Sequence, residues 1–191
     1  MCAHQPILRS LCAIVLFILN SSVADAADPK EPGLVRHPLT NQHSKPFAFE
    51  NLLGKPSVVH FGFTNCAVVC PTMLNGVAVY MQKLGKRSGE LNFVFVSVDP
   101  ERDTAKILKE YIENFDARII GVTGSAEGIA NFANRIGTRY EKRDIDGGGY
   151  EMAHVIFAYL LDKTGKMIST LYMGAESNPE VVMRRLTALI D

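Results

Sequence analysis

Residues 58–74 read VVHFGFTNCAVVCPTML, and this stretch decides the fold of the chain. It combines a short apolar strand (58–61), a polar turn and two cysteines, Cys66 and Cys70, at the start of a helical pattern. Pro71 suits the first position of a helix, because its missing N–H would have no intrahelical partner there. We therefore expect Cys70 at the helix N-cap, with Cys66 one turn of chain before it.

The two cysteines are spaced for joint chemistry. Residues four apart at a helix start have Cβ atoms about 5–6 Å apart, so their sulfurs can converge. They can form a disulfide, or they can bind one soft metal ion with bonds of about 2.3 Å, the zinc–thiolate value. The positive end of the helix dipole also favours thiolate over thiol. The pattern predicts a reactive pair.

The residues after the cysteines follow an α/β order. Apolar residues recur with helical spacing over 73–84, and Gly85 ends the helix. Residues 91–98 are nearly all apolar and rich in β-formers, which is typical of a parallel strand buried on both faces. A strand–helix–strand unit of this kind is right-handed, and such a sheet binds ligands at the carboxyl edge of its strands. The cysteine turn leaves its strand at that edge.

Turn and cap residues divide the rest of the domain. Residues 39–53 are predicted to form an N-terminal hairpin. Three side chains are predicted helix N-caps: Asp103, Ser125 and Asn178. The polar segment 139–149 ends in three glycines, so we expect a mobile loop there. The next strand is expected over 154–161, with His154 opening it.

Four separated motifs resemble those of the Sco/SenC family, thioredoxin-fold copper-binding proteins of cytochrome oxidase assembly. They are FGFTxCxxxCP at residues 61–71, SVDPERD at 97–103, GVTG at 121–124, and His154 in its late strand. The resemblance extends from residue 38 to the C-terminus. It implies a thioredoxin-like α/β fold, with a central mixed sheet flanked by helices.

The resemblance also implies a metal site and a role. One copper ion per chain, as Cu(I) or Cu(II), would be bound by Cys66, Cys70 and His154. Two thiolates and an imidazole suit copper better than hard cations. The protein would be a monomeric copper chaperone for a cuproprotein client, such as the copper subunit of cytochrome oxidase. Oxidation of Cys66 and Cys70 to a disulfide would block the site, so a thiol reductant protein is a second expected partner.

The chain departs from the family pattern at three places. Asn65 stands where the family often has His, Val68 stands where it has Asp between the cysteines, and Ala153 replaces the Asp before the metal-binding His. Two carboxylates near the metal are therefore missing. The loop becomes an apolar surface suited to docking a partner, and a client other than cytochrome oxidase is an alternative.

Other functions fit the same loop. In a thiol–disulfide oxidoreductase, Cys66 would attack a substrate disulfide and Cys70 would resolve the mixed disulfide. A structural disulfide in a binding module is a third, non-enzymatic interpretation. A peroxidase is disfavoured, because the surroundings of a peroxidatic cysteine are absent from the sequence.

Five further residues are candidates for a role in the site. His37 and His43 lie in polar segments and are interpreted as solvated rather than metal-binding. Met73 is interpreted as core filler, with soft metal ligand as the alternative. His60 is predicted to be a hydrogen-bonded structural histidine inside a strand. Asp99 is assigned to turn chemistry, the alternative being that it orients the metal site.

The N-terminus resembles a secretory leader. Residues 1–26 contain one early arginine, a nine-residue apolar core over 11–19 and an Ala-Asp-Ala cleavage pattern at 24–26. A membrane-spanning helix needs about 20 apolar residues, so cleavage is predicted, with an uncleaved membrane anchor as the alternative. The leader predicts an exported, periplasmic protein. Of the four cysteines in the chain, only Cys66 and Cys70 would remain after the leader is removed.

The remaining chain is predicted to form one domain. Residues 27–37 are polar and proline-rich, which indicates a linker, and residues 38–191 form the thioredoxin-like domain. Lys plus Arg and Asp plus Glu both number 20, so the net charge is zero. This balance argues against nucleic acid as a partner.

Overall fold

The computed structural model describes residues 38–191. The predicted leader (1–26), the predicted linker (27–37) and His37 lie outside the described residues. Within the described part of the chain, no helix has the length and apolar character needed to cross a membrane.

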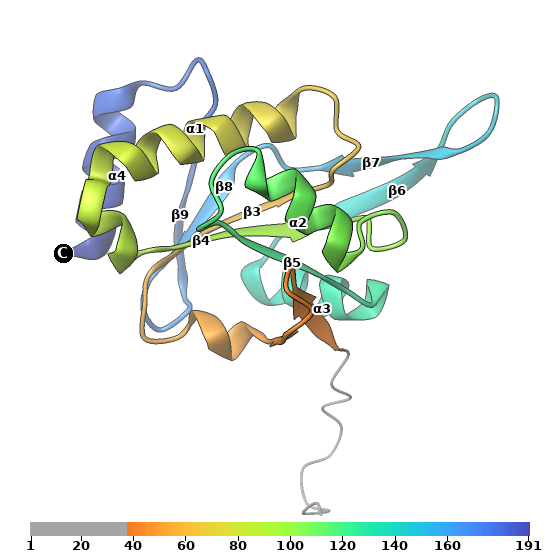
Figure 1. Cartoon of the computed structure of the whole chain (residues 1–191), viewed down its shortest axis with the longest axis horizontal. Helices are drawn as coiled ribbons and strands as arrows, with labels where there is room; N and C mark the ends of the chain where they lie inside the picture. The colour runs from red at the N-terminus through yellow and green to blue at the C-terminus, as the bar shows by residue number, and fades with distance from the viewer. Residues whose placement is uncertain (1–37) are drawn as a thin grey trace, which may run out of the picture. The chain divides into compact units, whose positions relative to one another are not determined.

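A seven-stranded mixed sheet forms the centre of the domain (Figure 1). The strand order is β2-β1-β5-β4-β3-β8-β9. The parallel strands are β3 (Ser57–Gly62), β4 (Asn92–Ser97) and β5 (Ile120–Gly124). The flanking antiparallel strands are β1 (Leu39–Asn41), β2 (Pro46–Phe47), β8 (Ala158–Leu161) and β9 (Met167–Leu171). The predicted mixed α/β sheet with an N-terminal hairpin is confirmed.

Helices cover both faces of this sheet (Figure 1). They are α1 (Val69–Leu84), α2 (Ala105–Glu113), α3 (Ala126–Ile136) and α4 (Pro179–Ile190), with 3₁₀ turns η1 (Phe49–Leu52) and η2 (Gly85–Glu90). Figure 1 shows α1 and α2 on one face and α3 on the other. The predicted caps Ser125 and Asn178 are confirmed, since both side chains accept bonds from first-turn N–H groups. Asp103 is not a cap, and Thr104 caps α2 instead.

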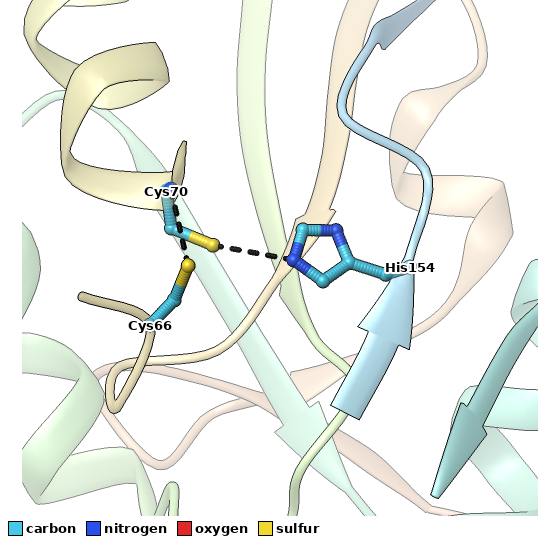
Figure 2. A group of neighbouring side chains, drawn as sticks. All are labelled: Cys66, Cys70 and His154. Atoms are coloured by element: carbon cyan, nitrogen blue, oxygen red, sulfur yellow. Dashed lines mark hydrogen bonds between the residues drawn. The ribbon is translucent and has the colours of Figure 1, made fainter. Parts of the chain in front are cut away.

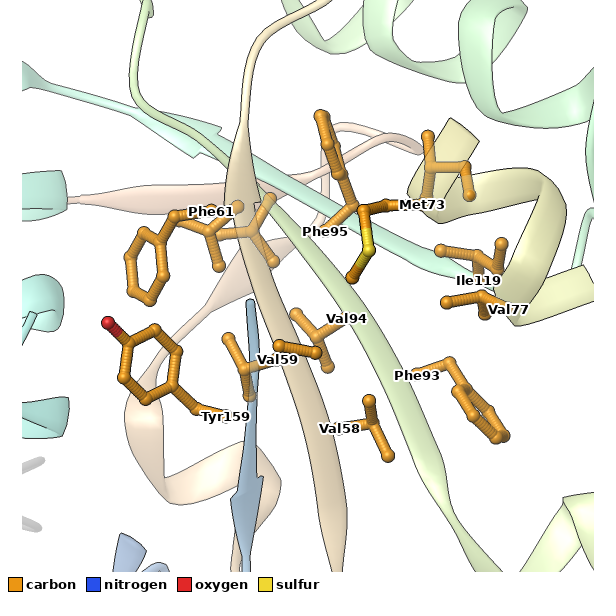
Figure 3. Close-up of a cluster of buried hydrophobic side chains, with 14 of the residues drawn as sticks. Val58, Val59, Phe61, Met73, Val77, Phe93, Val94, Phe95, Ile119 and Tyr159 are labelled. Atoms are coloured by element: carbon orange, nitrogen blue, oxygen red, sulfur yellow. The ribbon is translucent and has the colours of Figure 1, made fainter. Parts of the chain in front are cut away.

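The core surrounds β3, the strand that leads to the cysteines. Phe61 packs on Tyr159 of β8 and Phe132 of α3, with ring centroids 6.0 and 6.2 Å apart. Met73 and Val77 of α1 lie on the other side of the strand (Figure 3). Met73 has no exposed surface, so its assignment as core filler is confirmed. Burying a side chain of this size stabilises the fold by about 1.5–3 kcal/mol, which anchors the strand beneath the site.

A separate two-stranded ribbon pairs β6 (Tyr140–Asp144) with β7 (Tyr150–His154). The prediction of a loop over 139–149 was therefore wrong for β6, and His154 closes β7 instead of opening the next strand. The reason is that β6 is almost wholly exposed, so it lacks the alternating apolar residues that identify a half-buried strand. Only the glycine turn matches the prediction, with positive φ at Gly147, Gly148 and Gly149.

Candidate metal centre

The cysteine loop joins the end of β3 to the start of α1. The helix begins at Val69 with Val68 at the N-cap, so the prediction of Cys70 as N-cap was wrong by two positions. The cause lies in the loop, because the sulfur of Cys66 accepts a hydrogen bond from the Cys70 N–H at 3.4 Å. This bond satisfies a first-turn N–H group in the way that a capping side chain does. The helix can therefore start before Pro71, which the first turn tolerates.

Three soft donor atoms converge at the start of this helix. The sulfurs of Cys66 and Cys70 and a ring nitrogen of His154 all lie within 4.8 Å of one another. Cys70 Sγ and His154 Nε2 lie 3.6 Å apart across the site (Figure 2). Among the described His, Cys, Asp and Glu residues, these three form the one group of three or more that could hold a metal ion. The structure thus brings the three predicted site residues together.

The imidazole of His154 is oriented by its own strand end. Its Nδ1 lies 3.0 Å from the carbonyl oxygen of Val155, so Nδ1–H donates there and the Nε2 lone pair faces the sulfurs. The ring stands edge-on to Phe63 and His60, at centroid distances of 5.6 and 6.0 Å. Burial lowers the pKa of His154, although the Val155 carbonyl opposes the shift. A neutral imidazole is the form that binds metals.

The two thiols differ in exposure. Cys70 is completely buried, whereas Cys66 is half-buried. Burial raises the pKa of the Cys70 thiol, which a backbone hydrogen bond at Phe63 only partly offsets. The inner cysteine therefore carries a proton at neutral pH, and the outer one is the sulfur that a partner can reach.

Gly62 makes room for the inner sulfur. A Cβ at this position would lie 2.7 Å from both Cys70 Sγ and the Phe95 ring. We expect Gly62→Ala to displace Cys70 and to lower Cu(I) affinity about tenfold, with a loss of about 1–3 kcal/mol in the free energy of unfolding from overpacking. Competition with a chromophoric Cu(I) chelator and urea denaturation measure the two effects.

The matched control for that substitution is Gly89→Ala. A Cβ at Gly89 meets no atom within 4 Å, so both affinity and stability should stay at the wild-type values. Wild-type Cu(I) affinity in Gly62→Ala would show that the sulfur does not depend on this close approach.

A buried carboxylate holds the cysteine loop in place. Asp103 has no exposed surface and accepts hydrogen bonds from the backbone N–H and the hydroxyl of Thr64, at 2.9 and 2.6 Å. It also accepts one from the Ser97 hydroxyl at 2.6 Å. The acid predicted to cap α2 thus ties the turn before Cys66 to the end of β4.

A second set of contacts attaches the ribbon that carries His154. Asp99 is almost fully buried, pairs with Arg102 and accepts a 2.8 Å hydrogen bond from the Tyr150 hydroxyl. The Arg102 guanidinium also lies 4.0 Å from the centroid of the Tyr150 ring. Desolvation and the bond to Asp99 raise the pKa of Tyr150 to about 12, so the phenol stays a donor. Asp99 thus orients β7 through Tyr150, and it makes no hydrogen bond to the cysteines or to His154.

Sequence reasoning missed several of these supporting residues. Tyr150, Arg102 and Phe63 were not predicted to support the site, although Phe63 lies within the FGFTxCxxxCP motif and Arg102 within the SVDPERD motif. Their partners are far away in the chain, so local patterns gave no signal beyond the motif. His60 was predicted to be fully hydrogen-bonded, but its Nε2 is buried without a partner among the described residues. His43 is exposed and is not part of the metal-ligating group.

Comparisons with known proteins agree with this geometry. The family model described as SCO1/SenC matches residues 26–191. A "SCO2-like protein" of Rickettsia felis is 34% identical over 150 residues, which cover 78% of this chain and 72% of the relative.

Solved structures are also similar. The structure of Bradyrhizobium japonicum ScoI with copper bound has a TM-score of 0.73 and 33% identity, over 80% of this chain and 96% of that one. Arabidopsis thaliana ScoI with copper bound has a TM-score of 0.70 and 31% identity, over 80% and 94% of the two chains. The predicted thioredoxin-like fold is confirmed.

Proposed function

Because this chain belongs to the SCO1/SenC family, we propose that it is a copper chaperone that binds one copper ion through Cys66, Cys70 and His154. The observation that carries the proposal is the convergence of two sulfurs and one imidazole nitrogen within 4.8 Å. Two similar proteins, the bacterial and plant ScoI, were solved with copper bound. This chain has the same fold, and its own site offers two sulfurs and one imidazole, which suit copper.

The donor set fits copper in both oxidation states. Thiolates select soft Cu(I), and imidazole suits Cu(II) as well. Cu(I) is satisfied by the two sulfurs of Cys66 and Cys70, whereas Cu(II) gains from the nitrogen of His154. The imidazole belongs to the β6–β7 ribbon, which is a different segment of the chain from the loop that holds the sulfurs. The cysteine loop thus supplies the two ligands that Cu(I) needs, and the ribbon adds the imidazole that Cu(II) also uses.

A chaperone must also release its metal. Cys66 is the accessible sulfur, so a client thiol or imidazole can replace it as a copper ligand before Cys70 dissociates from the metal. Exposed apolar side chains flank the site, with exposed fractions of 68% at Val68, 41% at Ile156 and 40% at Phe157. This apolar rim suits a docked client. The client we propose is the copper subunit of a respiratory oxidase or another exported cuproprotein, with the chaperone acting as a monomer.

The thiols must be reduced to bind copper. A Cys66–Cys70 disulfide would need an S–S bond of about 2.05 Å and would use both sulfurs. We therefore propose that a thiol reductant protein keeps the pair open. Copper delivery and thiol reduction both fit an exported, periplasmic protein, the location that the leader predicted for residues 1–26 implies.

A second candidate function is thiol–disulfide reduction. The exposure difference favours it, since Cys66 can reach a partner disulfide and Cys70 lies behind it. Cys66 thiolate would attack one sulfur of the partner disulfide and release the other as a thiol. Cys70 would then attack Cys66, freeing the second partner thiol and leaving a Cys66–Cys70 disulfide. The two electrons come from this protein's dithiol, which the reductant restores.

Metal titration distinguishes the two functions. The reduced protein should bind one equivalent of Cu(I) or Cu(II), and Cys66→Ser should abolish tight binding of both. His154→Ala should weaken Cu(II) about 10- to 100-fold and Cu(I) by less than about threefold. A protein that binds no copper, yet reduces a protein disulfide catalytically in the presence of chelator, would instead be the reductase. His154→Ala should then have almost no effect.

A further inference from the structure

A second imidazole lies beneath the metal centre. His60 is on β3, two residues before Gly62, and its exposed fraction is 2%. Alternate residues of a strand share a face, so His60 and Gly62 lie on the same face of the sheet. The Cys70 sulfur rests on that face against Gly62. The His60 ring is also edge-on to His154, with centroids 6.0 Å apart.

One nitrogen of this buried ring has no partner. His60 Nδ1 lies 3.4 Å from the Phe157 carbonyl oxygen, so it is the protonated nitrogen, and Nε2 keeps a free lone pair. No described residue hydrogen-bonds to Nε2. A buried polar atom without a partner is destabilising, and such atoms are rare in folded proteins.

Cu(II) gains from a fourth donor beyond the three already described. It favours a four-donor, tetragonal site with nitrogen or oxygen ligands. The nearby carboxylates are used elsewhere, because Asp103 bonds Thr64 and Ser97, and Asp99 bonds Arg102 and Tyr150. Val68 and Ala153 supply no oxygen side chain. The Tyr111 hydroxyl is also buried without a partner, but burial raises its pKa, so it stays a protonated phenol. Among the described side chains, His60 Nε2 is then the unpartnered nitrogen that has a lone pair, and its ring contacts that of His154.

We propose that His60 Nε2 is the fourth ligand when the site holds Cu(II), giving a set of two sulfurs and two imidazole nitrogens. The inference rests on the proposed copper-binding function. His60 is not within the 4.8 Å group, so its ring must move toward the metal when Cu(II) binds. The 3.4 Å contact of Nδ1 is long for a hydrogen bond, so it resists this movement only weakly. Cu(I), which two sulfurs satisfy, does not need this ligand.

Pulsed EPR of the Cu(II)-loaded protein tests the proposal by counting imidazole nitrogens. Wild type should show two coordinated imidazoles, and His60→Phe and His154→Ala should show one each. In His60→Phe, Cu(II) affinity should fall about 10- to 100-fold, with Cu(I) affinity changed less than about threefold. His43→Gln, which alters an exposed histidine outside the group, is the matched control and should keep two.

The outcomes separate this proposal from the broader one. One imidazole in wild type and none in His154→Ala would overturn the role of His60 and leave the copper chaperone intact. Failure of wild type to bind copper would overturn both. His60→Phe removes an unpartnered nitrogen, so the copper-free variant should keep the wild-type circular dichroism spectrum. If His60→Phe misfolds, the number of coordinated imidazoles in His154→Ala tests the proposal instead. A single coordinated imidazole in that variant would be that of His60.

Discussion

Asp103→Ala is expected to lower the free energy of unfolding by about 3–5 kcal/mol, because it leaves three donors around the buried Asp103 carboxylate without their acceptor. These donors are the N–H and hydroxyl of Thr64 and the hydroxyl of Ser97. The turn that carries Cys66 would also lose its tie to the end of β4. We therefore expect Cu(I) affinity to fall together with stability. Urea denaturation of the copper-free protein and chelator competition measure the two losses.

Thr64→Val is the matched control for this prediction. It removes one hydroxyl bond but keeps the Asp103 carboxylate and its bond to the Thr64 N–H. Its cost should be about 1 kcal/mol, the typical net value of one hydrogen bond. Equal costs for Asp103→Ala and Thr64→Val would show that the carboxylate does not act as the shared acceptor.

The sequence predicted the elements whose signals are local. The apolar run around β4 and the helical spacing of α1 each lie within one segment, and both elements were found where expected. Ser125 and Asn178 cap the helices that directly follow them, so their roles are also local. The β6–β7 ribbon was missed because it packs little apolar surface and has no alternating pattern to detect.

The site was predictable only in part, for the same reason. Cys66 and Cys70 are four residues apart, so their proximity follows from the chain itself. The approach of His154 depends on the ribbon and could be expected only from the family resemblance. The role of Asp103 escaped prediction, because its partner Thr64 is 39 residues away. A carboxylate before a helix was read as a cap, whereas the fold uses it to join two loops.

Cu(I) affinity is expected to rise steeply with pH, by at least about 100-fold from pH 6 to pH 8. Burial raises the pKa of Cys70, so its thiol is protonated throughout this range. Copper binds thiolates, so each thiol proton released on binding makes the affinity rise about tenfold per pH unit. Cys70 alone accounts for about 100-fold over two pH units, and any proton that Cys66 also releases adds to this slope. Cu(I) is bound by the two sulfurs, and burial lowers the pKa of His154, so the imidazole contributes little to the slope. The sign is therefore set by the inner cysteine: acid weakens binding.

Competition with a Cu(I) chelator, corrected for the chelator's own protonation, measures this slope at constant ionic strength. His154→Ala is the matched control, because it removes the imidazole and should leave the slope unchanged. Cys70→Ser should lose tight binding and should show a smaller slope, since it lacks one of the two thiols that can release a proton. An affinity that varies less than about twofold over the range would mean that Cys70 is already a thiolate. Copper could then enter without displacing a proton, and burial would not control loading.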